Sequence, residues 1–237
     1  LIALFFCSAC SVSLGRSPDA GSARKEGEPS LAVNGHSISS FEILDRMLSP
    51  LTDIRRFPKL KNVVAVGFSA GGQFMQRYAL GTALPDDQES LSYRFIIASP
   101  GAYLYVTPER AQSKTNPSFV QVQASLCPGF DSYRYGLQKR NEYMQRSTGE
   151  KMLERLKGRT MIFMVGEADT STGGVLDKSC AANFQGPNRY RRSVIYFAYL
   201  NHLFPNSNSR FYSVPKAVHD AAAVLQSRSG RMALFDP

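Results

Sequence analysis

Short apolar runs rich in β-branched residues alternate along the chain with segments of helical periodicity. Four of these runs predict strands, at 62–66, 95–98, 161–165 and 211–214. The first is apolar on both faces, as a central strand of a parallel sheet must be. Strands that alternate with helices predict an α/β fold, a mostly parallel sheet with helices on both faces.

The helices between these strands are expected at 73–80, 151–156 and 191–200, with a final helix through 219–227. Another helix should begin at Ser39, because Ser39 and Glu42 form a capping box ahead of apolar residues at helical spacing. Pro50 is expected to kink or divide that helix.

Two segments depart from this alternation. In the N-terminal segment, 1–38, the stretch 1–15 resembles the apolar part of a secretory leader and equally fits a buried strand, while 15–38 is typical of a linker. A leader would indicate a secreted or extracytoplasmic protein. The core is expected over 39–237, interrupted at about 103–149 by a long, aromatic, loop-rich insert of the kind that forms lids.

The composition is that of a globular protein. The chain has 237 residues, of which 43% are hydrophobic and 20% charged, and a net charge of +9. The basic residues are scattered in short groups, so we expect a solvated surface and no nucleic-acid partner. No apolar run reaches the length of about 18 residues that favours a membrane helix. An oxidising compartment would make a Cys127–Cys180 disulfide plausible.

The sequence VVAVGFSAGGQF places Ser69 between Gly67 and Gly71 at the end of the first core strand. A loop rich in small residues would explain this stretch. A nucleophilic serine explains it better, because a strand precedes it, a helix follows it, and the small neighbours relieve a sharp turn. The N–H of Ala70, at the start of the helix, would then help to hold an oxyanion.

A nucleophilic serine needs a base and an acid. Of the three histidines, His219 follows the last strand and is preferred to His202, because the carboxyl ends of parallel strands meet at one edge. His36 lies before the core. Asp169 lies beyond the end of strand 161–165 and is the expected acid. Asp177 is the fallback, and Glu167 lies closer to the strand.

The chain order Ser69, Asp169, His219 resembles that of the α/β-hydrolase superfamily. The resemblance is closer to an esterase-like group of serine hydrolases with the motifs HSAGGQFxQRY and VPGxGHD, which here stand as FSAGGQFMQRY and VPKAVHD. It extends from about Arg24 to the C-terminus. Phe68 and Val218 replace the expected His and Gly, and Phe68 is expected to alter the wall of the substrate pocket.

The resemblance also implies several strands before Ser39. The segment 1–38 has room for one of them at most. The chain is therefore expected to be N-terminally incomplete. One such strand neighbours the strand of the nucleophile and leads into a loop that donates the second oxyanion N–H. That donor has no assignment in the sequence.

These features predict a serine hydrolase that cleaves a small-molecule carboxylic ester through an acyl-enzyme, with no metal or organic cofactor. Tyr103 and other aromatic residues of the insert either shape a substrate pocket or pack the insert onto the core. The alternative function is a catalytically impaired hydrolase-fold fragment that acts as a binding module. The sequence indicates no oligomeric state.

Overall fold

Five parallel strands form the central sheet of the chain. The computed structural model describes residues 2–6, 25–29, 37–84, 86, 91–113, 115 and 117–236. The strand order is β1-β2-β3-β6-β7, and every neighbouring pair is parallel. These strands are β1 (Ile2–Phe6), β2 (Asn62–Phe68), β3 (Ser92–Ala98), β6 (Thr160–Gly166) and β7 (Arg210–Val214). The predicted α/β fold class is confirmed.

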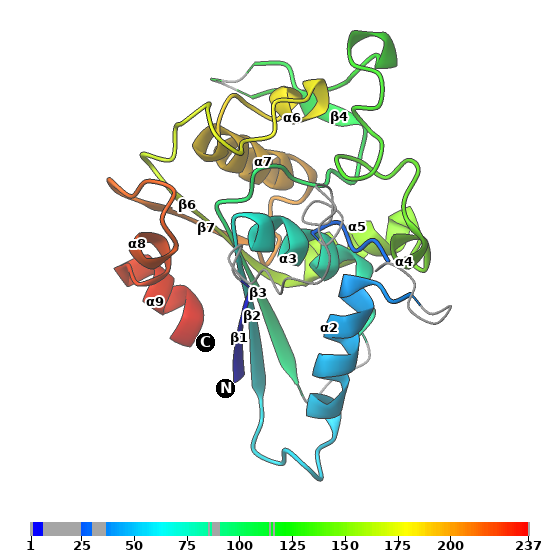
Figure 1. Cartoon of the computed structure of the whole chain (residues 1–237), viewed down its shortest axis with the longest axis vertical. Coiled ribbons are helices and arrows are strands. Elements are labelled where there is room, and N and C mark those ends of the chain that lie inside the picture. The colour runs from blue at the N-terminus through cyan, green and yellow to red at the C-terminus, as the bar shows by residue number, and fades with distance from the viewer. Residues whose placement is uncertain are drawn as a thin grey trace.

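Helices cover both faces of this sheet (Figure 1). Side chains alternate between the faces, so that Val63 and Ala65 belong to one hydrophobic cluster while Val64 and Val66 belong to another. The first cluster is completed by α2 (Ser40–Leu48), α3 (Ala70–Gly81), α5 (Gly149–Gly158) and α7 (Arg189–Leu203). The second is completed by α8 (Ala221–Leu225) and α9 (Arg228–Phe235).

The first helix of the core begins where its cap predicts. The Ser39 side chain accepts a hydrogen bond from the Phe41 N–H at the start of α2. Pro50 lies at the start of a short 3₁₀ helix, η1 (Ser49–Thr52), so the predicted division of this segment is confirmed. Glu42 forms ion pairs with Arg46 and Arg146.

Two predicted helix boundaries are corrected. α7 begins at Arg189, two residues before the prediction, because the Asn188 side chain caps it by accepting from the Arg191 N–H. The expected helix over 219–227 is α8 alone, and α9 follows after Ser227, which caps it. Asp220 caps α8, so His219 precedes this helix.

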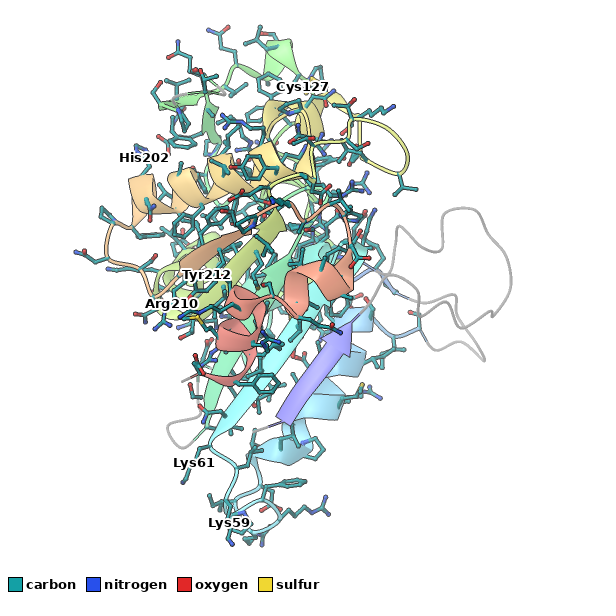
Figure 2. The ribbon with its side chains drawn as sticks, turned by 90° about the vertical axis from the view of Figure 1, so that its left-hand side faces the viewer. Lys59, Lys61, Cys127, His202, Arg210 and Tyr212 are labelled. Atoms are coloured by element: carbon teal, nitrogen blue, oxygen red, sulfur yellow. A yellow bond between two sulfur atoms is a disulfide. The ribbon has the colours of Figure 1, made fainter. Side chains whose placement is uncertain are left out.

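The insert has its own short elements. They are the antiparallel pair β4 (Glu109–Ala111) and β5 (Phe119–Gln121), the 3₁₀ helix η2 (Ala124–Leu126) and the short helix α4 (Glu142–Gln145). The guanidinium of Arg110 is fully buried and donates to the carbonyls of Phe130 and Tyr135. A disulfide joins Cys127 to Cys180 in α6 (Cys180–Phe184), with the two Cα atoms 5.9 Å apart. The Arg110 hydrogen bonds hold parts of the insert together, and the disulfide fixes the insert to α6; Cys127 is labelled in Figure 2.

The N-terminal residues add one strand to the sheet. β1 pairs with β2, and Phe6 lies opposite Gly67. The rest of the leader-like stretch lies outside the described residues, and the expected linker is described only at 25–29 and 37–38. Within the described part of the chain, no helix has the length and apolar character needed to cross a membrane.

Candidate active site

Ser69 lies on a sharp turn between β2 and α3. Its φ is +57° and its ψ is −114°, a conformation that residues other than glycine rarely adopt. The turn is crowded, because a Cβ on Gly67 would lie 2.0 Å from the carbonyl oxygen of Gly71. The Ser69 N–H donates to the Ala98 carbonyl at the end of β3, at 2.9 Å. The strand and the helix therefore hold Ser69 at the carboxyl edge of the sheet.

The loops after β6 and β7 are bonded to each other at the same edge. The Glu167 N–H donates to the Val214 carbonyl at 3.0 Å, and the Ala168 N–H donates to the Ala217 carbonyl at 2.9 Å. A Cβ on Gly166 would lie 2.2 Å from that Ala217 oxygen, so only glycine allows this approach. This pairing holds Asp169 and His219 in fixed positions relative to one another.

The structure brings the three side chains Ser69, His219 and Asp169 together. His219 Nε2 lies 2.9 Å from Ser69 Oγ, and His219 Nδ1 lies 2.7 Å from Asp169 Oδ2. The Asp169 side chain is fully buried, while that of His219 is 27% exposed. The Phe68 ring packs against the imidazole, with 4.8 Å between the ring centroids. This arrangement can transfer a proton from the hydroxyl to the imidazole and stabilise the resulting charge.

The start of α3 supplies donors for an anion beside Ser69. Ala70 is the first residue of this helix and Ser69 is its N-cap. The first N–H groups of a helix have no partner within it, and they carry its positive partial charge. β1 is the strand that neighbours β2, and the residues directly after Phe6 lie outside the described part of the chain. The second oxyanion donor therefore stays unassigned.

The other candidate groups lie elsewhere. His202 lies near the end of α7 (Figure 2). Its ring stacks on Phe119, and its Nε2 lies 3.7 Å from Glu109 Oε1. The Asp177 carboxylate accepts hydrogen bonds from Tyr135 and Arg134. Glu167 accepts from the Ser213 hydroxyl. His36 lies outside the described residues.

The assignment of Tyr103 to substrate binding is corrected by its burial. Its side chain is fully buried, its ring stacks on Tyr196 at 4.2 Å, and its hydroxyl lies 2.9 Å from the Ser193 Oγ. Tyr105 is equally buried and packs against the same helix, α7. Both rings therefore pack the insert onto the core, the second of the two alternatives drawn from the sequence.

Arg189 was not singled out in the sequence. It is the first residue of α7, and its Nη1 lies 3.8 Å from Asp169 Oδ1. Burial lowers the pKa of its guanidinium, against the opposing effect of the Asp169 charge. The sequence did hold one signal for it. Arg189 directly follows Asn188, a good N-cap residue, and so lies at the end of a helix where the dipole disfavours a cation.

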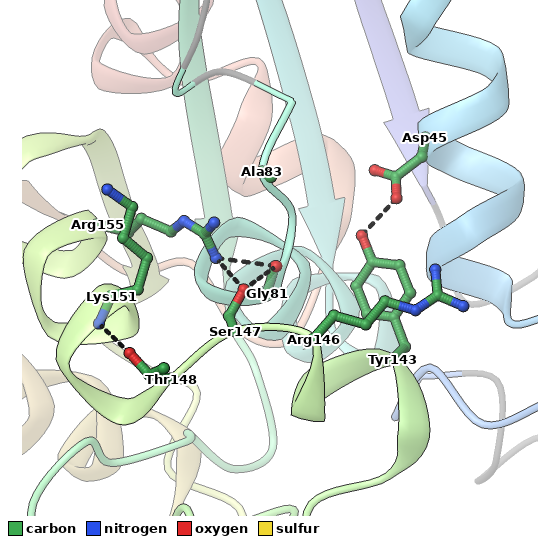
Figure 3. Close-up of a pocket in the computed structure, with 9 residues that line it drawn as sticks. All are labelled: Asp45, Gly81, Ala83, Tyr143, Arg146, Ser147, Thr148, Lys151 and Arg155. Carbon is green, nitrogen blue, oxygen red and sulfur yellow. Dashed lines mark hydrogen bonds between the residues drawn. The ribbon is translucent and has the colours of Figure 1, made fainter.

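A separate cavity of about 530 Å³ lies between α2, the end of α3 and the α4–α5 segment (Figure 3). Its polar groups bond to one another: Asp45 accepts from Tyr143, and Arg155 donates to Ser147 and the Gly81 carbonyl. Ser69 lies at the opposite end of α3, which is about 18 Å long. The cavity is therefore separate from the Ser69 site.

The described residues include no group of three or more His, Cys, Asp or Glu side chains that fits a metal ion. The Ser69 site itself offers one imidazole and one buried carboxylate, which hydrogen-bond each other at 2.7 Å.

Solved structures that align with this chain include a depolymerase and a hydrolase. A poly(3-hydroxybutyrate) depolymerase from Bordetella parapertussis aligns with a TM-score of 0.61 and 21% identity, over 90% of this chain and 63% of that one. The chain has the α/β-hydrolase fold. A poly(aspartic acid) hydrolase from Sphingomonas sp. KT-1 aligns with a TM-score of 0.55 and 20% identity, over 83% of this chain and 64% of that protein.

The chain thus spans slightly less than two thirds of both structures. No family model matches the sequence, and no curated protein matches it.

Proposed function

We propose that the chain is a serine hydrolase that cleaves carboxylic esters. The observation that carries this proposal is the continuous hydrogen-bonded series from Ser69 through His219 to Asp169, at 2.9 and 2.7 Å. The fold supports it, because related structures include a protein named as a polyester depolymerase. The substrate class is an ester of the kind that a Ser-His-Asp site opens by acyl transfer.

In the proposed reaction, Ser69 Oγ attacks the ester carbonyl while His219 Nε2 accepts its proton. The negative charge on the carbonyl oxygen is held by the Ala70 N–H at the start of α3. The imidazolium then donates its proton to the leaving alcohol, which departs and leaves an acyl group on Ser69. Asp169 stabilises the imidazolium throughout. A water molecule then attacks the acyl carbonyl while His219 accepts its proton, and the bond to Ser69 Oγ breaks as the imidazolium returns that proton to Oγ, which releases the acid.

A fluorophosphonate probe tests this proposal, because it reacts with activated serines. We expect the wild-type protein to be labelled and to hydrolyse p-nitrophenyl acetate, and Ser69→Ala to lose both activities. Ser213→Ala is the matched control: Ser213 lies on β7, and its hydroxyl donates a hydrogen bond to Glu167, outside the proposed triad. Its labelling should equal that of wild type.

A folded wild-type protein that neither reacts with the probe nor hydrolyses the ester would contradict the proposal. Circular dichroism and a cooperative thermal transition would establish the folded state. That result would favour the alternative of a hydrolase-fold binding module.

A further inference from the structure

The two oxygens of the Asp169 carboxylate have different surroundings. Oδ2 hydrogen-bonds to His219 Nδ1 at 2.7 Å, whereas Oδ1 is buried and has no hydrogen bond to any described residue. A buried carboxylate oxygen without a donor weakens the ionised form of the group. Oδ1 therefore lacks the hydrogen-bond donor that a buried carboxylate oxygen normally has.

Arg189 is the cation closest to that oxygen in the described part of the chain. Its Nη1 lies 3.8 Å from Oδ1, which is an ion-pair distance and too long for a hydrogen bond. The residue is 5% exposed, and its Nε is likewise buried without a hydrogen bond to a described residue. The Asp169 carboxylate and the Arg189 guanidinium are thus two buried, oppositely charged groups that form an ion pair. Neither Oδ1 of Asp169 nor Nε of Arg189 has a hydrogen bond to a described residue.

The position of Arg189 on its helix supports the same pairing. A cation at the first residue of a helix is disfavoured by the helix dipole, and α7 has no acidic residue in its first turn. The Tyr190 N–H, also in that turn, donates to the Asp169 carbonyl at 3.1 Å. The first turn of α7 is therefore held to the Asp169 loop by a backbone hydrogen bond as well as by the ion pair.

We propose that Arg189 is a positioning residue, which holds Oδ1 of Asp169 so that Oδ2 stays aligned with Nδ1 of His219. This inference rests on the proposed hydrolase function. Arg189 does not touch the reacting atoms and acts only through Asp169. Two further groups interact with this pair: besides their burial, the Asp169 charge helps to raise the pKa of Tyr103, and the Arg189 charge helps to lower the pKa of Arg192. Both stay in place in every variant considered below.

Arg189→Met removes the charge and keeps much of the side-chain volume. We expect kcat for an ester substrate to fall about 10- to 100-fold, the effect of losing a charged partner, with little change in KM. The acid limb of the pH profile should move to higher pH, because removing a nearby positive charge makes it harder for the site to lose the proton that the active form must lose. Arg189→Lys should restore part of the rate and most of the profile.

Arg191→Met is the matched control, because Arg191 lies on the same helix and is half-buried. It should leave kcat and the pH profile unchanged. Arg189→Gln takes the place of Arg189→Met if the latter does not fold, as judged by its thermal transition. A wild-type pH profile in a folded Arg189→Met or Arg189→Gln variant would overturn the proposal, even if stability were lowered.

Proton NMR gives a readout that does not depend on activity. The His219 Nδ1 proton, bonded to Asp169, should give a strongly downfield resonance that is absent from His219→Gln. We expect Arg189→Met to shift or broaden this resonance and Arg191→Met to leave it unchanged. An unchanged resonance in Arg189→Met would overturn the positioning role. A wild-type protein without esterase activity would instead overturn the proposed function, whatever the resonance did.

Discussion

At the scale of single residues, the site depends on backbone geometry as much as on reactive groups. Ser69 adopts a positive φ because the chain must reverse between β2 and α3, and Gly67 makes this possible by having no Cβ. Such strained conformations persist only where the surrounding structure enforces them. Here the conformation is held by the hydrogen bond from the Ser69 N–H to the Ala98 carbonyl and by the packing of α3 on β2 and β3.

Gly67→Ala should therefore disrupt the turn. The added methyl group would lie 2.0 Å from the Gly71 carbonyl oxygen, which is backbone and has no room to move aside. We expect the free energy of unfolding to fall by more than about 2 kcal/mol and probe labelling of Ser69 to be lost. Gly158→Ala, where the added atom meets nothing within 4 Å, is the control and should be neutral or slightly stabilising.

Asp169→Asn should preserve the fold and remove most of the proposed activity. An amide neither stabilises the imidazolium nor holds the required tautomer, so kcat should fall about 10⁴-fold, the size of the effect in a known serine protease. Steady-state hydrolysis of p-nitrophenyl acetate would measure it. Glu167→Gln, an exposed neighbour on the same loop, should keep near wild-type kcat. Full activity in the Asp169→Asn variant would remove Asp169 from the mechanism.

At the scale of elements, the site is assembled by loops that are fixed to one another. The loops after β6 and β7 share two backbone hydrogen bonds, and the insert is joined to α6 by the Cys127–Cys180 disulfide. The segment 170–179, between Asp169 and α6, is anchored by Asp177, which binds Tyr135 and Arg134 of the insert. Elements distant in sequence thereby restrict the position of the Asp169 loop.

The double variant Cys127→Ser, Cys180→Ser should be less stable by about 2–4 kcal/mol. The bond closes a loop of 53 residues, whose removal returns conformational entropy to the unfolded chain. Urea unfolding would measure the loss. Wild-type protein unfolded in the presence of dithiothreitol should match the double variant. Equal stability with and without reductant would show that the disulfide contributes nothing.

The Asp177 contacts predict a loss of stability in acid. Burial alone would raise the pKa of Asp177, but hydrogen bonds from Tyr135 and Ser179 and the Arg134 charge lower it below its ordinary value. The ionised carboxylate therefore stabilises the folded state above about pH 4, and this contribution disappears as the pH falls through the lowered pKa. Urea midpoints of wild type and Asp177→Asn should differ most at pH 7 and converge below about pH 4. Glu154→Gln, which breaks an exposed pair, should show no such convergence.

The sequence predicts the elements with strong local signals and misses those decided by tertiary packing. β2 and β6 were recognisable because a strand buried on both faces is apolar at every position. β1 was not separable from a leader, because a five-residue apolar run is the same pattern in both. The break between α8 and α9 depends on a single cap, Ser227. The three-residue strands β4 and β5 carry no periodicity.

The same contrast holds for the candidate site. Ser69, Asp169 and His219 could be nominated because they follow parallel strands, whose carboxyl ends must meet. Tyr103 was misplaced because an aromatic residue in an insert has the same appearance whether it lines a pocket or packs on a helix. Arg189 was missed because its partner, Asp169, is distant along the chain and is found only in three dimensions.

At the scale of the whole molecule, the two faces of the sheet are covered unequally. Several helices pack on the first face, whereas α8 and α9 cover the second in the described part of the chain (Figure 1). α8 directly follows the loop that carries His219. The position of His219 therefore depends on the second hydrophobic cluster, in which α8 and α9 pack on the sheet.

Leu234→Ala tests that dependence. Leu234 is 5% exposed in this cluster, so its truncation should lower the free energy of unfolding by about 2–5 kcal/mol. Phe235→Ala, on the same helix and 60% exposed, should change it by less than about 1 kcal/mol. Chemical denaturation of both variants would measure the difference. Equal effects would show that α9 is not held by its buried side.

His219 is separated from Ser69 by 150 residues along the chain, which would determine when the proposed nucleophile becomes reactive during synthesis. Ribosomes release the N-terminal part first, so β2, Ser69 and α3 emerge long before the loop that carries the imidazole. Until that loop docks, Ser69 would lack the base proposed for it, and we expect the nascent chain to leave esters unhydrolysed. Reactivity of Ser69 would then report, in a cell or a translation extract, that the last strand has joined the sheet.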